Sequence, residues 1–261
     1  DYGAFLTTRQ KRKKLAENRE AFLEWNTNFT PKVFERLLKD KKTACTGYAY
    51  LIREMALLAG LQCKIVNGYG RTPTLLLDTE STPNHSWNTI KIDGKWYLCD
   101  ATWSAGRVML EENGPQFQSD YFDGYFLADP ELFVKNHYPL EIGSTLLADP
   151  PSFEEFLEGP VVYKEAFGFP IIPIGPTKMQ LKTLKNESVL FKLQIKKELK
   201  KKSIHLVLNS GGSDRKVPPK ITRTKNKFTL EHSFTKTGLY DVHIQIDDIL
   251  IATYIVRVKR K

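Results

Sequence analysis

The sequence has few cysteines and no long apolar run, which excludes two large classes of protein. Three cysteines in a chain of 261 residues cannot build a disulfide scaffold, and at least one thiol must stay free. No apolar segment approaches the roughly 20 residues that a membrane-spanning helix needs, so we expect no membrane span. The chain starts at Asp1, without a methionine or a signal-peptide pattern, and we expect a processed or truncated start.

The net charge is close to zero in residues 1–150 and strongly positive in the rest of the chain. The net charge is +9, but residues 1–150 carry 18 basic and 19 acidic side chains, whereas residues 151–261 carry 21 and 11. The lysines cluster at 196–202 and at the C-terminal end, without the interleaved aromatics or motif typical of nucleic-acid binding. We therefore expect no nucleic-acid partner and a basic face that meets solvent or an anionic surface. Binding of an anionic polymer is the alternative, and its affinity would fall steeply with salt.

The N-terminal half shows helical periodicity first and strand periodicity afterwards. Amphipathic helices are predicted at 11–25, from Thr30-Pro31 onward, and at about 46–59, where Gly60 ends the helix. On the last of these helices we expect one buried side, formed by Tyr48, Leu51, Ile52, Met55 and Leu58. The period then changes to two, which predicts strands at 64–70, 85–92 and 95–103.

The sequence of the C-terminal half predicts a connector followed by an all-β domain. Residues 104–140 are expected to be irregular, and the proline-rich segment 141–178 carries enough large apolar side chains to be an ordered connector. Short alternating runs separated by turn clusters then predict a small β-sandwich with strands at 189–195, 204–208, 227–234, 238–246 and 250–258. The expected domains are a core at 1–140, the connector at 141–178 and the sandwich at 179–261.

Three residues in this order carry the chemistry of a nucleophilic site: Cys45, His85 and Asp100. Cys45 stands among small and polar residues at a predicted helix start, where the unpaired N–H groups and the helix dipole favour a thiolate and can face an oxyanion. An imidazole can then act as a base, and a carboxylate can fix its tautomer. The pattern predicts cysteine-dependent acyl transfer.

A hairpin relates the imidazole to the carboxylate. Asp93-Gly94 is a strong two-residue turn signal, and with this turn the paired positions put His85 opposite Thr102 and Trp87 opposite Asp100. His85 and Asp100 then share one face as diagonal neighbours, within reach of a hydrogen bond. A slip of one residue would place them on opposite faces.

Each of these residues also has an ordinary structural explanation. A strand histidine is more often structural than catalytic, an aspartate after a strand is usually a turn or cap residue, and a free cysteine is usually part of the core. Cys63 and Cys99, in apolar strand-like runs, fit that core explanation. It is the joint placement of Cys45, His85 and Asp100 that favours a site.

The same stretch resembles the core of the transglutaminase-like superfamily. The runs Cys-Thr-Gly-Tyr-Ala at 45–49, Asn-His-Ser-Trp-Asn at 84–88 and Trp-Tyr-Leu-Cys-Asp-Ala-Thr-Trp at 96–103 are similar to its nucleophile, histidine and aspartate motifs, in that order. Residues 125–139 and the connector resemble the kyphoscoliosis-peptidase and hillarin-like branch and its bacterial relatives. The resemblance covers roughly residues 1–178 and extends loosely to the remainder.

This resemblance implies an α+β fold. The core would be papain-like, with the nucleophile at a helix N-terminus packed on an antiparallel sheet, followed by an immunoglobulin-like β-sandwich. It implies Cys45 as nucleophile, His85 as base and then acid, and Asp100 as the orienting carboxylate. We expect Trp87, Gly47 and Tyr48 to bind substrate. The acidic calcium sites of animal transglutaminases have no counterpart in this sequence, so no metal and no cofactor are expected.

The resemblance leaves the reaction and the compartment open. We expect a peptidase or amidase, or a transglutaminase-type acyltransferase, that acts on a protein or peptide through a thioester. The alternative is an inactive transglutaminase-like scaffold that binds proteins. The start of the chain and the appended sandwich favour an exported protein, periplasmic or at the cell surface, over a cytoplasmic one.

Overall fold

The computed structural model describes residues 43–75, 77–111, 114–197, 203–212 and 214–260, with isolated positions before residue 43. The helices predicted at 11–25 and from Thr30-Pro31 lie outside these described stretches. The chain divides into two compact units. The first unit comprises residues 1–70, 80–133 and 137–150, and the second comprises residues 71–79, 134–136 and 151–261.

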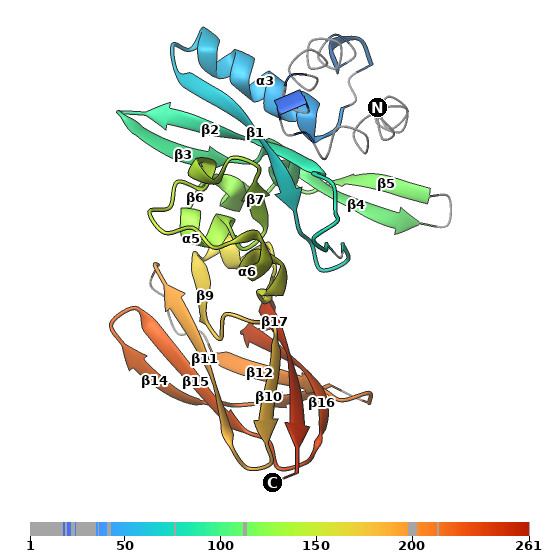
Figure 1. Ribbon diagram of the computed structural model, residues 1–261, viewed down its shortest axis with the longest axis vertical. Coiled ribbons are helices and arrows are strands. Elements are labelled where there is room, and N and C mark those ends of the chain that lie inside the picture. The colour runs from blue at the N-terminus through green and yellow to red at the C-terminus, as the bar shows by residue number, and fades with distance from the viewer. Residues whose placement is uncertain are drawn as a thin grey trace. The chain divides into compact units, whose positions relative to one another are not determined.

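The first unit is built on a five-stranded antiparallel sheet with the strand order β6-β3-β2-β1-β7 (Figure 1). β1, which lies next to the edge strand β7, pairs with β2 on one side and with the short β7 on the other. The bounds of these strands are β1 Gln62–Gly70, β2 His85–Ile92, β3 Lys95–Cys99, β6 Phe126–Ala128 and β7 His137–Pro139.

Helix α3, Cys45–Leu58, packs against β1 and β2. Its buried positions are the small residues of the first turn together with Ala49 and Ala56, and the Asn88 amide of β2 donates a hydrogen bond to the Ala49 carbonyl at 2.8 Å. The predicted buried side was wrong, because Met55 and Leu58 are 57% and 90% exposed. Small residues face the sheet here because the helix backbone approaches the strands closely.

The hairpin register follows the two-residue turn. Ile92 pairs with Lys95, and the ladder continues to Asn88 opposite Cys99, as predicted. The predicted strand at 95–103 was wrong beyond Cys99, because Asp100 leaves the sheet and caps helix α4, Ala101–Ala105. Thr102 is therefore a helical residue and does not face His85 across the sheet.

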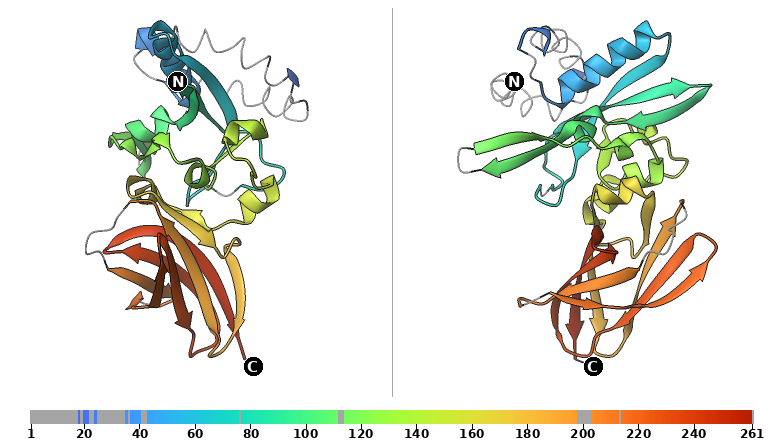
Figure 2. Two further views of the ribbon diagram at one scale, coloured as in Figure 1. Left: turned by 90° about the vertical axis from the view of Figure 1, so that its left-hand side faces the viewer. Right: turned by 180° about the vertical axis from the view of Figure 1, so that it is seen from behind.

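Residues 104–140 are more regular than expected. A hairpin of β4, Gly106–Glu111, and β5, Gly114–Ser119, follows α4 and projects from the first unit in the right-hand view of Figure 2. The remaining short elements flank the strands β6 and β7: η1 Asp123–Tyr125 precedes β6, α5 Pro130–Phe133 lies between the two strands, and η2 Ile142–Thr145 follows β7. The expectation of irregular structure was wrong, and β6 and β7 in particular could not be predicted because a three-residue strand leaves little periodicity in a sequence.

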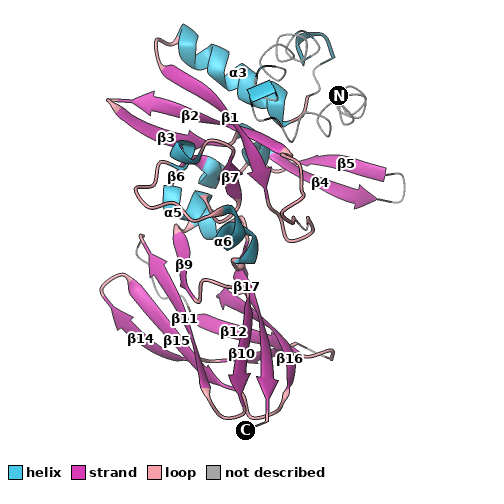
Figure 3. Cartoon of the chain, viewed as in Figure 1, coloured by secondary structure: helices cyan, strands magenta, loops and turns pink. Residues whose placement is uncertain are grey.

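The second unit contains a β-sandwich, whose strands are magenta in Figure 3. One sheet has the order β10-β17-β16-β12-β13 with β8 paired to β17, and the other has the order β14-β15-β11-β9. Phe191 of β11 packs on Tyr254 of β17 between the sheets, with ring centroids 5.0 Å apart. The larger strands are β10 Gln180–Leu184, β11 Ser188–Ile195, β12 Ile204–Asn209, β15 Lys227–Ser233, β16 Gly238–Ile246 and β17 Ile249–Lys259.

The predicted fold class, an α+β core followed by an immunoglobulin-like sandwich, is confirmed, and all five predicted sandwich strands are present. Residues predicted to form a separate connector contribute to this sandwich, since β8 and β9 pair with its strands. The shorter elements here are α6 Phe153–Glu158, β8 Val161–Val162, α7 Glu165–Gly168, β9 Ile171–Gly175, β13 Arg215–Val217 and β14 Lys220–Thr224.

A buried arginine organises the start of the second unit. The Arg71 guanidinium donates hydrogen bonds to five backbone carbonyls at 2.7–3.2 Å, and burial lowers its pKa to about 10. The accepting residues are Lys135, Phe156, Leu157, Gly159 and Pro160. Since the last turn of a helix leaves its carbonyls unpaired, Arg71 serves as the C-terminal cap of α6.

None of the helices described here combines the length and the apolarity that crossing a membrane requires.

Candidate functional site

Cys45 is the first residue of α3 and is 8% exposed. The N-cap residue is Ala44, which provides no side-chain hydrogen bond, and the first turn contains no acidic residue. The positive end of the helix dipole is therefore not neutralised by a capping side chain, and it favours an anion at this position. A helix start of this kind stabilises a thiolate.

Two glycines of β1 allow two histidines to meet above the sheet. Gly68 pairs with His85 of β2, and Gly70 pairs with His137 of β7. A Cβ atom at Gly70 would lie 3.0 Å from the Cβ and Cγ of His85, so the His85 side chain rests directly over this glycine. The two imidazole centroids are 5.4 Å apart. A side chain on β1 at Gly70 would fill the space that His85 occupies.

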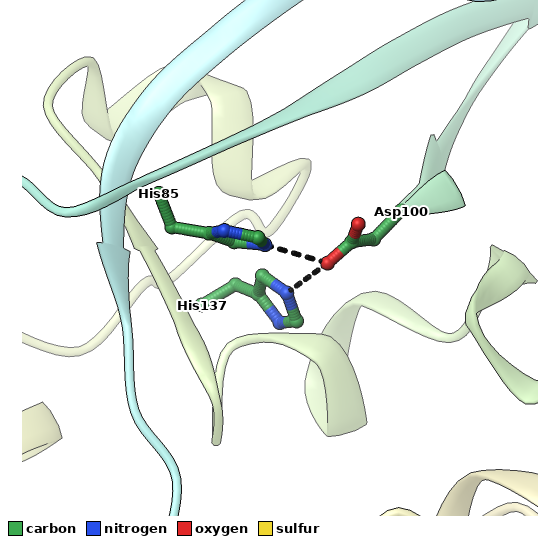
Figure 4. Close-up of side chains that lie close together, drawn as sticks. All are labelled: His85, Asp100 and His137. Carbon is green, nitrogen blue, oxygen red and sulfur yellow. Dashed lines mark hydrogen bonds and ion pairs between the residues drawn. The ribbon is translucent and has the colours of Figure 1, made fainter. Parts of the chain in front are cut away.

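Asp100 uses its two carboxylate oxygens for two different tasks. Oδ1 accepts hydrogen bonds from the backbone N–H groups of Thr102 at 2.8 Å and Trp103 at 3.1 Å, which caps α4. Oδ2 lies 2.7 Å from Nε2 of His85 and 3.0 Å from Nε2 of His137 (Figure 4). The carboxylate is completely buried, and its interactions with the two histidines lower its pKa well below the usual range, against the opposing effect of burial.

His85 is held as a cation between Asp100 and Cys45. Burial alone would lower its pKa, but the charge and hydrogen bond of Asp100, followed by the hydrogen bond and charge of Cys45, raise the pKa to about 10. Because Nε2 is bound to Asp100, Nδ1 is the ring nitrogen that remains for the Cys45 thiol. The structure thus brings the three predicted residues together.

His137, in contrast, is held as a neutral imidazole. Burial lowers its pKa to about 4, although the hydrogen bond and charge of Asp100 act in the opposite direction. Its ring is stacked on Phe133 at 3.9 Å and contacts the Trp103 ring at 4.2 Å, while the Trp87 ring meets it edge-on at 5.2 Å. This aromatic enclosure excludes the water that a second cation would need.

The His85, Asp100 and His137 side chains are also the group that could offer ligands to a metal ion among the described residues. The two Nε2–Oδ2 distances of 2.7 and 3.0 Å are those of direct hydrogen bonds. A zinc ion would instead stand between the nitrogen and oxygen atoms, about 2.0–2.2 Å from each. The arrangement is therefore that of a hydrogen-bonded cluster.

The three residues expected to bind substrate lie close to the site in different settings. Gly47 and Tyr48 are in the first turn of α3, where both backbone N–H groups donate to the Ala44 carbonyl and so are not available as oxyanion donors. The Gly47 backbone faces the Thr43 side chain. Trp87 is 1% exposed and lies beneath the imidazoles. Their contact with a substrate stays a prediction.

Buried polar atoms without a hydrogen-bond partner concentrate at this site. Of five such side-chain atoms among the described residues, four belong to the site or to a residue next to it, and the fifth is Nε2 of His232 in the sandwich. The four are Thr46 Oγ1, Trp87 Nε1, Thr102 Oγ1 and His137 Nδ1. Unpaired buried groups are costly, and their retention in one place is typical of a functional site.

Sequence reasoning missed His137 and Trp103, which complete the cluster. His137 lies on a three-residue strand in a segment without strand periodicity, so it gave no signal of its own. The glycines at alternate positions of β1 were a usable signal, because a glycine inside a strand often marks the close approach of another group. Trp103 stacks on His85 at 5.0 Å and follows the cap residue Asp100 by one helical turn.

Residues 7–101 match the sequence profile of the transglutaminase-like superfamily. The matched range includes Cys45, His85 and Asp100, and it ends before His137. The class indicated by the resemblance is confirmed.

Curated relatives point to the predicted branch of that superfamily. The chain is 29% identical to human kyphoscoliosis peptidase over 156 residues, which is 59% of this chain and 23% of that protein. It is 28% identical to hillarin of Drosophila melanogaster over 138 residues, which is 48% of this chain and 17% of that protein. The chain thus spans about a quarter or less of the length of these relatives.

Among solved structures, the similarity lies in immunoglobulin-like and filamin-like domains. The filamin domain of Lin-41 is 14% identical, with 40% of this chain and 99% of that chain covered and a TM-score of 0.29. The I81 domain of titin is also 14% identical, with 35% and 97% covered and a TM-score of 0.22. The sandwich assignment above comes from the strand pairing itself.

Proposed function

We propose that this protein catalyses cysteine-dependent acyl transfer on amide bonds of a protein or peptide, with Cys45 as nucleophile, His85 as general base and acid, and Asp100 as the orienting carboxylate. The observation that carries the proposal is the hydrogen bond of 2.7 Å between His85 and Asp100, in a site where His85 also interacts with the Cys45 thiol. The superfamily match supports it, since its members are often cysteine-dependent acyltransferases or peptidases.

The electrostatics support an ion pair as the resting state. A raised pKa keeps His85 protonated at neutral pH, and the N-terminus of α3 stabilises the negative charge on the Cys45 sulfur. Asp100 supplies the compensating charge, so the imidazolium is stabilised without contact with water. The nucleophile is then ionised before substrate binds.

In the proposed reaction the Cys45 sulfur attacks the carbonyl carbon of an amide, and the C–N bond breaks as His85 gives its proton to the departing nitrogen. A thioester with Cys45 remains, and the amine product leaves. Water or an amine then gives a proton to neutral His85 and attacks the thioester carbon. The C–S bond breaks, and the thiolate–imidazolium pair is restored.

Water is the acceptor that we favour. Nothing in the sequence marks an amine-acceptor site, and a relative with 29% identity bears the name kyphoscoliosis peptidase. The decisive assay is incubation with a glutamine-containing protein, with and without an amine donor. Ammonia, incorporated amine and cleaved peptide are scored separately. We expect cleavage or ammonia release without the donor, and amine incorporation as the larger product would contradict hydrolysis.

Three variants test the assigned roles in the same assay. Cys45→Ala should abolish turnover, and Asp100→Asn should lower kcat at least about 100-fold, because the imidazolium loses its counter-charge. Cys63→Ala is the matched control, since Cys63 is an equally buried free thiol on β1. Activity that survives in Cys45→Ala, or is lost in Cys63→Ala, would refute the assignment.

One observation favours the second candidate, an inactive scaffold that binds proteins: Cys45 and His85 are only 8% and 7% exposed. The alkylation rate of Cys45 by iodoacetamide, measured against pH in the folded protein, separates the two. An enzyme should show fast labelling well below pH 8.5 that slows in His85→Ala. A thiol that reacts only after unfolding, together with no turnover, would favour the scaffold.

A further inference from the structure

A second histidine bonds to the same oxygen as the proposed base. Oδ2 of Asp100 accepts from Nε2 of both His85 and His137, at 2.7 and 3.0 Å, and Figure 4 shows the two rings converging on this atom. His137 is on β7, and nothing in the proposed reaction requires it to touch a substrate. Its position nevertheless is set by strand pairing with Gly70.

We propose that His137 is a positioning residue, which donates its Nε2 proton to Asp100 and thereby holds the carboxylate ionised and aimed at His85. The inference rests on the proposed function for its kinetic consequence but not for its geometry. With His85, Thr102 and Trp103 it gives the Asp100 carboxylate four donors.

The tautomer follows from the acceptor. An ionised carboxylate can only accept, so Nε2 of His137 must carry the proton, and a neutral ring then has a bare Nδ1. Nδ1 makes no hydrogen bond of good geometry among the described residues, although the nearby Phe133 carbonyl acts to raise the pKa of the ring, and the rings of Phe133 and Trp103 cover the imidazole. A proton on Nδ1 would create a second buried cation beside His85, whose charge opposes it.

The surrounding titratable groups give the cluster one dominant negative charge. Three titratable groups face His137: Asp100 from the start of α4, His85 from β2 and Tyr125 from η1. Cys45 lies on the far side of His85, and Cys99 is the last residue of β3. One imidazolium and one neutral imidazole therefore share one carboxylate. The neutral ring binds the carboxylate without competing for its charge.

Imidazole nitrogen NMR of the full chain tests this arrangement without any turnover. The protein has five histidines, so each ring can be assigned by single substitution. At pH 7 we expect one ring, His85, protonated at both nitrogens, and another, His137, in the neutral form with the proton on Nε2. A His137 ring that is charged, or protonated only on Nδ1, would overturn the proposal.

The kinetic arm compares His137→Leu with His137→Gln. Leucine removes the donor, and we expect kcat to fall between about 10- and 100-fold with little change in KM, because a small misplacement of a catalytic group has this effect. Glutamine can place an amide N–H near the position of Nε2 and should restore at least half of the lost activity. His232→Leu, at a half-buried histidine of the sandwich, is the matched control and should change neither constant.

The two arms separate this inference from the proposed function. A wild-type protein without turnover but with the expected NMR states would refute the function and leave the role of His137 toward Asp100 standing. Wild-type turnover with equal kcat in all His137 variants would refute the positioning role alone. If His137→Leu fails to fold, as judged by tryptophan fluorescence, the NMR states and the kcat of His137→Gln decide.

Discussion

At the scale of single residues, Asp100 shows that a structural and a chemical role can coexist in one side chain. An aspartate after a strand is usually a cap, and Oδ1 of Asp100 is indeed the cap of α4. Oδ2 is left for the two histidines. Because the cap fixes the carboxylate plane, it also fixes the direction from which His85 must approach.

The pKa values of the two histidines predict how stability depends on pH. In the folded protein the pKa of His85 is raised to about 10. The stability that His85 contributes is therefore complete below its pKa in the unfolded chain, about 6.5, and is lost as the pH rises toward 10. The folded pKa of His137 is lowered to about 4, so the unfolded chain takes up a proton first as pH falls from about 6.5 toward 4. Both effects lower the free energy of unfolding away from about pH 6.5.

We therefore expect a maximum of stability between about pH 6 and 7, with slopes of up to about 1.4 kcal/mol per pH unit on each side. Urea unfolding followed by tryptophan fluorescence measures it. All four tryptophans precede residue 104, so the signal reports on the N-terminal part of the chain. His137→Gln should flatten the acid side and His85→Ala the alkaline side. An unchanged free energy between pH 6.5 and 8.5 in the wild type would contradict the assignment of His85.

At the scale of elements, the site depends on how closely three strands approach one another. β1 lies between β2 and β7. Gly68 of β1 pairs with His85 of β2 on one side and with Pro139 of β7 on the other. A Cβ atom there would lie 2.1 Å from the Tyr138 carbonyl oxygen and 2.8 Å from the Trp87 ring. Since the first of these atoms is backbone, it cannot move aside without moving β7.

Gly68→Ala should displace β7, and with it His137, from the site. We expect destabilisation of roughly 2–4 kcal/mol, within the range known for overpacking and backbone strain, together with the kcat loss predicted for His137→Leu. Urea unfolding and steady-state kinetics measure the two effects. Gly143→Ala is the matched control in the same unit, because a Cβ atom there would meet nothing within 4 Å. Equal stability of both variants would show that β7 tolerates the shift.

At the scale of the whole molecule, the two units depend on different kinds of interaction. The sandwich buries alternating apolar residues of its two sheets, as β11 shows with every second residue inward at its start. The segment before the sandwich instead depends on a buried charge, the guanidinium of Arg71. Its hydrogen bonds go to five backbone carbonyls. Such a network is strong only while all its members are paired.

Arg71→Lys should therefore destabilise the second unit although the charge is kept. A lysine ammonium has three donors on one atom and cannot reproduce the planar guanidinium, so several buried carbonyls would lose their donors. We expect a loss of about 3 kcal/mol or more in chemical unfolding followed by circular dichroism. Arg257→Lys, at an exposed position of β17, should change stability by less than about 0.5 kcal/mol. Similar losses in both variants would contradict the capping role of Arg71.

Features that depend on neighbours along the chain could be predicted from the amino-acid sequence alone. The Asp93-Gly94 turn fixed the register of β2 and β3, alternation predicted the sandwich strands, and the motifs around Cys45, His85 and Asp100 indicated the superfamily. These features are local because a turn type or a two-residue period is set by the side chains within a few positions.

The packing of distant segments against one another set which residues meet across the sheet. It turned the large apolar residues at the end of α3 away from the strands, ended β3 at Cys99, and brought His137 onto Asp100. A three-residue strand has too few side chains to show a period, so its place is fixed by pairing with β1 and by the space that Gly68 and Gly70 leave. Long-range pairing of this kind stabilises the folded chain without leaving a pattern in the sequence around it.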